Sequence, residues 1–148
     1  MVQKVLIGIV TVITFVYAGC VAPVIPLEGA PVISPIGGHV FYDKGEYSDG
    51  WRYLEAAPKD AGEATWDKAF QLCDTFVYGG KDDWFLPSKD EMKKMLDVRI
   101  IVRGEKDFWS STEYNRDDAW YANTLNFTDD LKTTRKVYHL HVLPIRRF

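Results

Sequence analysis

Two strand-like stretches separated by turn residues open the regular part of the chain. The segments HVFYD (39–43) and WRYLEAA (51–57) are rich in the β-branched and aromatic residues that favour strands. Between them lies KGEYSDG, which ends in the turn pair Asp49-Gly50. This pattern predicts a β-hairpin.

Apolar residues at helical spacing follow in two segments. In TWDKAFQLCDTFVYGG (65–80), Thr65 is placed to cap the start of a helix and Gly79-Gly80 to close its end. The apolar stripe of this segment consists of Trp66, Ala69, Phe70, Cys73, Phe76 and Val77. In PSKDEMKKML (87–96), Ser88 and Glu91 have the spacing of a capping box, which predicts a second helix.

The tail KVYHLHVLPIRRF (136–148) alternates apolar positions with His139 and His141. Alternation of this kind predicts a strand, and Pro144 predicts that the strand lies at a sheet edge or carries a bulge. The order strand, strand, helix, helix, loop, strand predicts an α+β domain over residues 37–148.

The first nineteen residues have a different pattern. One lysine is followed by fifteen uncharged residues, 5–19, a run that is short for a membrane span of about 20 residues and typical of a signal peptide. The run ends in VYAGC, which resembles a bacterial lipobox, in which the cysteine is lipidated and becomes the mature N-terminus. We therefore expect a signal peptide at 1–19 and a lipid on Cys20. An ordinary signal peptide cut near Ala18 and an uncleaved anchor are the alternatives.

A proline-rich segment links this cysteine to the domain. Residues 20–36 contain the run VAPVIPLEGAPVISPI, in which proline favours extended backbone, so we expect a tether. The implied protein is exported and membrane-anchored, at the outer membrane or the cell surface. Val21, rather than Asp, after the cysteine favours the outer membrane.

Composition and charge limit the possible functions. The 148 residues are 47% hydrophobic and 26% charged, which suits one folded domain with a tail. A formal charge of −3 without a basic cluster argues against nucleic acid as a partner. With Cys20 acylated, Cys73 has no cysteine partner, and its place on the apolar stripe of a helix predicts a buried thiol rather than a nucleophile.

Five motifs in fixed order carry a family resemblance: GGHVFYDKGEYSDGWRYLEAAP, DDWFLPSKDEMKKM, FWSSTEY, AWYANTLNF and VLPIRRF. Together, over about residues 37–148, they resemble the bacterial domain family typified by the C-terminal domain of the Legionella collagen-like adhesin. That family is related to the formylglycine-generating-enzyme branch of the C-type lectin fold. The chain departs from the family at Leu143, where arginine is common, and in its brevity.

The resemblance implies a specific architecture. The first and last strands would pair, two helices would flank small antiparallel sheets, and FWSSTEY and AWYANTLNF would be core strands joined by the NRDD turn. The enzymes of this branch need a pair of cysteines, which this chain cannot supply once Cys20 is acylated, so we expect no enzymatic activity and no catalytic residue.

The NRDDAWY segment holds the candidate ligand-binding residues. Four successive poor strand formers should turn outward between two strands, and a guanidinium, carboxylates and neighbouring rings suit a glycan or a polar protein epitope. The candidates are Asn115, Arg116, Asp117, Asp118, Trp120, Tyr121 and Asn123. Burial of the last three is left open, whereas Trp84 and Trp109 are expected to fill the core.

No metal or cofactor is expected. The calcium-binding triplets of lectins with this fold are absent, and adjacent acids at 82–83, 117–118 and 129–130 are more often simply solvated. His139 and His141 could share one strand face, but solvated or half-buried histidines are the simpler interpretation. The expected function is a displayed, non-catalytic lipoprotein that binds a glycan or protein in adhesion or recognition. The alternatives are a structural envelope lipoprotein without a small ligand, or a diversified ligand binder of the variable-protein type.

Overall fold

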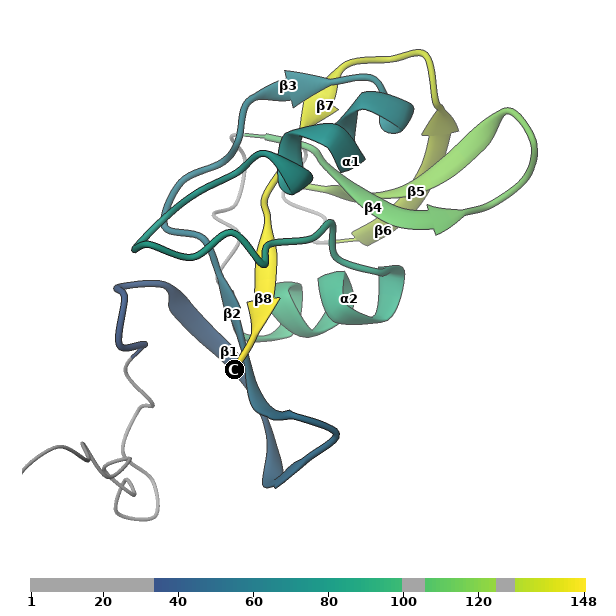
Figure 1. The fold of residues 1–148 in the computed structure, drawn as a ribbon. Coiled ribbons are helices and arrows are strands. Elements are labelled where there is room, and N and C mark those ends of the chain that lie inside the picture. The colour runs from purple at the N-terminus through teal and green to yellow at the C-terminus, as the bar shows by residue number, and fades with distance from the viewer. Residues whose placement is uncertain (1–33, 100–105, 125–129) are drawn as a thin grey trace, which may run out of the picture. The chain divides into compact units, whose positions relative to one another are not determined.

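The computed structural model describes residues 34–99, 106–124 and 130–148. Residues 32–148 form one compact unit, and the expected signal peptide, Cys20 and tether lie outside the described residues, except for the last residues of the tether. The unit is α+β, with two helices and two sheets, which confirms the expected class (Figure 1). No helix in the described part of the chain is long and apolar enough to cross a membrane.

The described chain contributes its first two strands to one sheet, the next five to the other, and returns to the first sheet with its last strand. The strands are β1 (His39–Ser48), β2 (Trp51–Ala56), β3 (Glu63–Ala64), β4 (Phe108–Glu113), β5 (Asp118–Asn123), β6 (Asp130–Arg135), β7 (Leu140–His141) and β8 (Ile145–Arg147). The helices are α1 (Trp66–Asp74) and α2 (Lys89–Asp97). One sheet has the strand order β1-β2-β8 and the other β3-β7-β4-β5-β6.

The predicted β1–β2 hairpin is confirmed. The two strands are antiparallel and are joined by Asp49 and Gly50, whose φ angles are 51° and 82°. Two positive φ angles in a two-residue loop match the twist of a hairpin, and Asp-Gly is the sequence that tolerates them.

The predicted pairing of the first and last strands is wrong. β8 pairs with β2, so β1 and β8 lie in one sheet but on opposite sides of β2. The tail is not one strand either, because residues 142–144 are buried and carry the chain from β7 in one sheet to β8 in the other (Figure 1). The carbonyl of Pro144 accepts a hydrogen bond from Ala57 (2.9 Å), and Val142 bonds to Ala61 and Gly62.

Both predicted helices are present, but α1 is shorter than expected. It ends at Asp74, and Thr75 takes the C-cap position, four residues before the first glycine. The apolar pattern of the sequence extends past this end to Phe76. Outside the helix, Phe76 packs edge-on against Trp84, with ring centroids 5.6 Å apart, so its apolar character serves that contact and not a longer helix. At α2 the predicted capping box is confirmed, with Ser88 and Glu91 bonding each other's backbone N–H.

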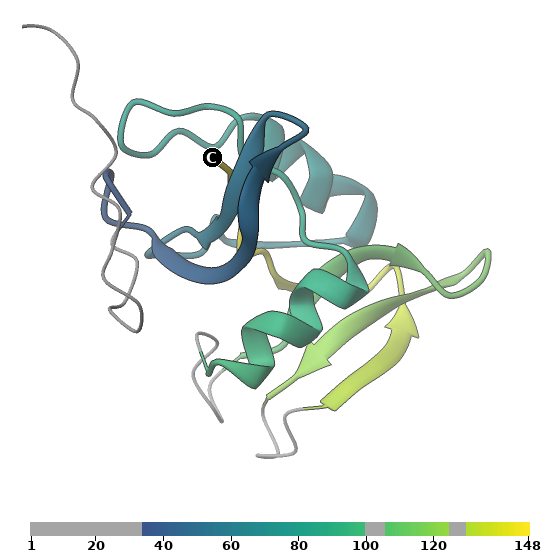
Figure 2. The same cartoon turned by 90° about the horizontal axis from the view of Figure 1, so that it is seen from below.

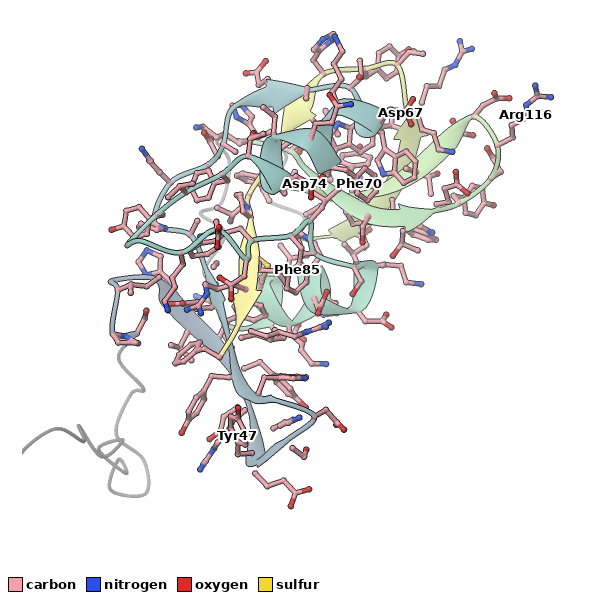
Figure 3. The ribbon with its side chains drawn as sticks, viewed as in Figure 1. Tyr47, Asp67, Phe70, Asp74, Phe85 and Arg116 are labelled. Carbon is pink, nitrogen blue, oxygen red and sulfur yellow. The ribbon has the colours of Figure 1, made fainter. Side chains whose placement is uncertain are left out.

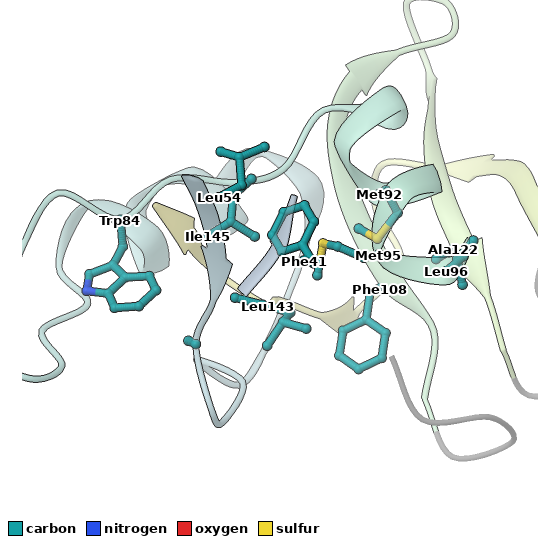
Figure 4. Close-up of a cluster of buried hydrophobic side chains, with 12 residues drawn as sticks. Phe41, Leu54, Trp84, Met92, Met95, Leu96, Phe108, Ala122, Leu143 and Ile145 are labelled. Atoms are coloured by element: carbon teal, nitrogen blue, oxygen red, sulfur yellow. The ribbon is translucent and has the colours of Figure 1, made fainter. Parts of the chain in front are cut away.

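Two hydrophobic clusters hold these elements together. The first lies between the β1-β2-β8 sheet and α2, and it continues along one face of β4 and β5 (Figure 4). The second lies under α1, where Trp109 is fully buried and its indole N–H donates to the carbonyl of Ala64 (2.9 Å). Trp84 is buried as well, so the core role predicted for both rings is confirmed.

A buried ion pair crosses the smaller sheet. Arg146 of β8 donates to Glu55 of β2 at 2.7 Å, and both residues are almost completely buried. The guanidinium also contacts both carboxylate oxygens of Asp83, at 2.8 and 3.2 Å. Sequence reasoning missed this pair, because the two residues are 91 positions apart in the chain.

Candidate recognition surface at the β4–β5 hairpin

The β4–β5 hairpin projects from the larger sheet and ends in the predicted turn (Figures 1 and 2). Asn115 organises this turn: its Oδ1 accepts hydrogen bonds from the backbone N–H groups of Asp117 and Asp118, both at 2.8 Å. Its Nδ2 donates to the Asp118 carboxylate at 2.9 Å. An Asn side chain that bonds the backbone two residues on is a common way to fix a turn. Asn115 and Asp118 therefore shape the turn, and their side chains are already engaged with each other.

Arg116 occupies the tip of the hairpin. Figure 3 shows its side chain extending away from the ribbon at the far end of the turn, and the residue is exposed. Its backbone carbonyl is held by Lys136 Nζ (3.0 Å), whose ammonium also pairs with Glu113. In the described part of the chain the Arg116 guanidinium makes no ion pair. The backbone of the tip is fixed while its cationic group is presented to solvent.

Beside the turn, Tyr114 and Trp120 form an aromatic pair. Their ring centroids are 5.6 Å apart at an interplanar angle of 88°. Lys89, the first residue of α2, places its ammonium 4.6 Å from the Trp120 ring centroid. Tyr114 is 59% exposed, so the pair is open to solvent on one side. We name Tyr114, Arg116, Trp120 and Lys89 the hairpin surface.

The hairpin surface lies next to the N-terminal end of α2, which contributes Lys89 to it. Ala122 and Leu131, on the same sheet face as Trp120, pack in the first hydrophobic cluster with the buried residues of α2. Trp120 lies one step further along the strand, opposite Thr133, and Asp118 lies opposite Arg135. Arg135 forms no ion pair with the described residues, so a second cation stands next to the hairpin surface.

Tyr121 and Asn123 do not join this surface. Successive residues of a strand point to opposite faces, so Trp120 and Tyr121 are separated by the sheet. Tyr121 packs against Trp109, with centroids 6.4 Å apart, and burial raises the pKa of its phenol. Asn123 is only 5% exposed and lies 3.4 Å from the Tyr121 hydroxyl. Of the seven candidates, the structure thus brings Asn115 to Asp118 and Trp120 together, places Tyr121 half-buried on the opposite sheet face and buries Asn123.

Sequence reasoning missed Tyr114 and Lys89. The position of Tyr114, just before a four-residue turn and on the face of Trp120, could have been inferred from strand alternation. Lys89 is distant in sequence, and only the packing of α2 against the sheet brings it to Trp120. No local pattern signals that contact.

The remaining chemical candidates are dispersed. Cys73 is buried beneath α1, and burial raises the pKa of its thiol to about 12. His139 is exposed, whereas His141 contacts Asp60 and Glu63 at 3.1 and 3.0 Å, one carboxylate on each ring nitrogen. Among residues 34–99, 106–124 and 130–148, no three His, Cys, Asp or Glu side chains converge as metal ligands would.

An open hollow of about 410 Å³ lies beside α1. It is lined by Glu63, Ala64, Lys68, Gln71, Leu72, Thr75 and His139. No Phe, Tyr or Trp ring lines it, so it offers less stacking area to a ligand than the hairpin surface.

Comparison with known proteins does not add to these observations. No protein-family model matches the chain, and no curated protein matches it.

Proposed function

We propose that this protein is a non-catalytic binding module, displayed from the bacterial envelope as a lipoprotein, that recognises a glycan or a protein. The observation that carries the proposal is the hairpin surface. An aromatic pair with one exposed and one half-buried ring, a fixed turn and cations without carboxylate partners in the described chain are collected at one projecting end of the domain.

The chemistry of this surface suits a polar ligand. Aromatic rings provide stacking area at low entropic cost, and a guanidinium adds a planar set of donors. Because the turn is held by Asn115 and Lys136, little backbone ordering is required when a ligand binds. A hydrophobic cofactor would find no enclosed apolar cavity here.

The finer fold assignment is part of the proposal. We infer a C-type-lectin-like domain similar to that of the Legionella collagen-like adhesin, on the strength of the five ordered motifs. The placement of β1 and β8 in one sheet and of a helix against each cluster supports this inference. The separation of β1 from β8 by β2 is a departure from the expected arrangement.

Anchoring rests on Cys20 and is tested separately. Cys20→Ser should abolish incorporation of labelled fatty acid and release the protein from membranes into the soluble fraction. More than one acyl chain is needed for stable attachment, which bacterial lipoproteins have, so loss of the acceptor should release the whole population. Unchanged labelling of the variant would eliminate the lipoprotein assignment.

Binding is tested by a glycan array and by pull-down from envelope extracts, followed by variants of the hairpin surface. Arg116→Ala and Tyr114→Ala remove exposed side chains that make none of the hydrogen bonds that hold the turn, and we expect each to weaken binding about tenfold or more if it contacts the ligand. The triple change of Arg116, Asp117 and Asp118 to Ala should abolish binding.

A matched control exists on the other hairpin. Tyr47 is 71% exposed. Tyr47→Ala therefore removes a similar exposed ring from the β1–β2 hairpin, which does not contribute to the hairpin surface. Equal losses for Tyr47→Ala and Tyr114→Ala, or full binding by the triple variant while it remains folded, would place recognition elsewhere. The absence of any ligand from both screens would favour the alternative of a structural envelope lipoprotein.

A further inference from the structure

β6 is the edge strand of the larger sheet, and its outer side has no described strand beside it (Figure 2). It pairs with β5 through six consecutive residue pairs, from Asp118↔Arg135 to Asn123↔Asp130, without a bulge. The strand contains no proline. Bulges and prolines are two means by which proteins protect open edges, and β6 has neither, although it carries the charged residues Asp130, Lys132 and Arg135.

The backbone groups that face outward can be assigned from the ladder. Lys136 N–H donates to the Asp117 carbonyl of the β5 side, and residues alternate along a strand, so Asp130, Lys132 and Thr134 also face β5. Leu131, Thr133 and Arg135 therefore direct their N–H and C=O groups away from the sheet.

Two of these six outward groups are already bonded within the chain. Leu131 N–H donates to Asp130 Oδ1 at 2.8 Å, and the Arg135 carbonyl accepts from Tyr138 N–H at 3.0 Å. Four groups remain open in the described chain: the Leu131 carbonyl, both groups of Thr133, and Arg135 N–H.

The open groups of one β6 strand match those of a second, antiparallel β6 strand. When two β6 strands run antiparallel about a two-fold axis at Thr133, Leu131 faces Arg135 of the second copy. The two Thr133 residues then exchange two hydrogen bonds, and each Arg135 N–H donates to the Leu131 carbonyl opposite. These four bonds use all four open groups on each strand, and none requires a group that is already engaged.

Symmetric registers centred on the other two outward residues lack this match. An axis at Leu131 would need Leu131 N–H, which Asp130 already binds. An axis at Arg135 would need its carbonyl, which Tyr138 binds, and would set two arginines directly opposite each other. In the Thr133 register, Asp130 stands opposite Lys136, and no like charges are directly paired.

We propose that β6 docks against β6 of a second copy of this chain, in antiparallel register centred on Thr133. The two five-stranded sheets join into one. The two Trp120 residues then lie on the same face, separated by three strand spacings or about 14 Å. Two hairpin surfaces would thus face one ligand-bearing surface together, which raises avidity through effective concentration.

A single strand pair buries less area than a standard stable interface, so we expect the dimer to form at high local concentration. The test uses the full chain in detergent with Cys20→Ser, which leaves buried Cys73 as the native thiol. Thr133→Cys places two thiols on residues whose Cα atoms lie about 5.5 Å apart, within disulfide range. We expect a disulfide-linked dimer on mild oxidation.

Lys132→Cys is the matched control on the same strand. Two copies of residue 132 are diagonal neighbours at about 7–8 Å, beyond disulfide reach, so this variant should remain monomeric on a non-reducing gel. A Thr133→Pro variant removes an outward N–H without removing a ladder bond to β5, so it should fold, as judged by circular dichroism, and lose self-association in sedimentation.

The outcomes decide the proposal. Crosslinking of Thr133→Cys but not Lys132→Cys, with loss of the dimer in Thr133→Pro, supports it. Equal crosslinking of both cysteine variants, or a wild-type chain that stays monomeric at its highest soluble concentration, overturns it. Neither result depends on finding a ligand for the hairpin surface.

Discussion

The side chain of Asp83 connects the buried Glu55–Arg146 pair to solvent. Its carboxylate bonds the guanidinium through both oxygens, while 53% of the side chain remains exposed. The hydrogen bond from Arg146 holds the pKa of Asp83 below its usual value of 3.8. Exposure screens this interaction, so its contribution to stability is about 1 kcal/mol or less.

The lowered pKa predicts how this contribution depends on pH. A carboxyl group whose folded-state pKa is depressed stabilises the fold above its unfolded pKa and loses that effect as pH falls through the folded value. The unfolding free energies of the wild type and Asp83→Asn should therefore differ by a constant amount above about pH 5 and converge below about pH 4. Urea titrations at several pH values measure this difference.

Asp82→Asn provides the control for that experiment. Asp82 is the exposed neighbour of Asp83 and forms no ion pair with the described residues. Its substitution should leave the stability nearly unchanged at every pH. A difference for Asp83→Asn that persists undiminished at pH 3 would show that the Arg146 contact is not electrostatic in origin.

Among the elements, the two helices differ in how they begin. Ser88 caps α2 with its side chain, accepting from Glu91 N–H at 3.3 Å. Thr65 occupies the same position in α1 but makes no side-chain capping bond. The difference offers an internal comparison of a capped and an uncapped start.

We expect Ser88→Ala to lower the unfolding free energy by about 1 kcal/mol, the usual cost of losing an N-cap bond. Thr65→Ala should cost clearly less, because no capping bond is lost. Chemical denaturation of both variants measures the two changes. Equal losses would mean that the capping bond of Ser88 contributes nothing beyond side-chain packing.

Elements with local signals were predictable from the sequence, and elements set by distant contacts were not. The Asp49-Gly50 turn and the Ser88–Glu91 capping box each lie within a few residues, and both are confirmed. The end of α1 was misplaced because Phe76 continues the apolar stripe while packing on Trp84 outside the helix. β6 was not predicted, since its sequence DLKTTR alternates little in hydrophobicity.

The same distinction applies to the candidate site. The turn from Asn115 to Asp118 is where its composition predicted, because four polar residues with poor strand propensity favour a turn in any context. The adjacency of Trp120 and Tyr121 in sequence suggested a shared surface, but strand geometry places them on opposite faces. Lys89 reaches Trp120 only through the packing of α2 on the sheet.

On the scale of the whole molecule, the chain passes from one sheet to the other more than once. Its final crossing, through buried residues 142–144, delivers β8 to the outer side of β2. β8 supplies Ile145 to the first hydrophobic cluster (Figure 4). It also supplies Arg146, which pairs with Glu55. The smaller sheet is therefore assembled from segments near both ends of the described chain.

This topology affects when the domain can fold during synthesis. A polypeptide is synthesised from its N-terminus, and Glu55 emerges 91 residues before the arginine that neutralises it. Until β8 has been made, burial of Glu55 would leave an unpaired charge in the core, at a cost of several kcal/mol. The nascent chain should therefore stay open and close only after residues 145–147 are available. Chains halted after Pro144 should be digested rapidly by protease, whereas chains that include β8 should resist; equal resistance would show that the domain closes without its last strand.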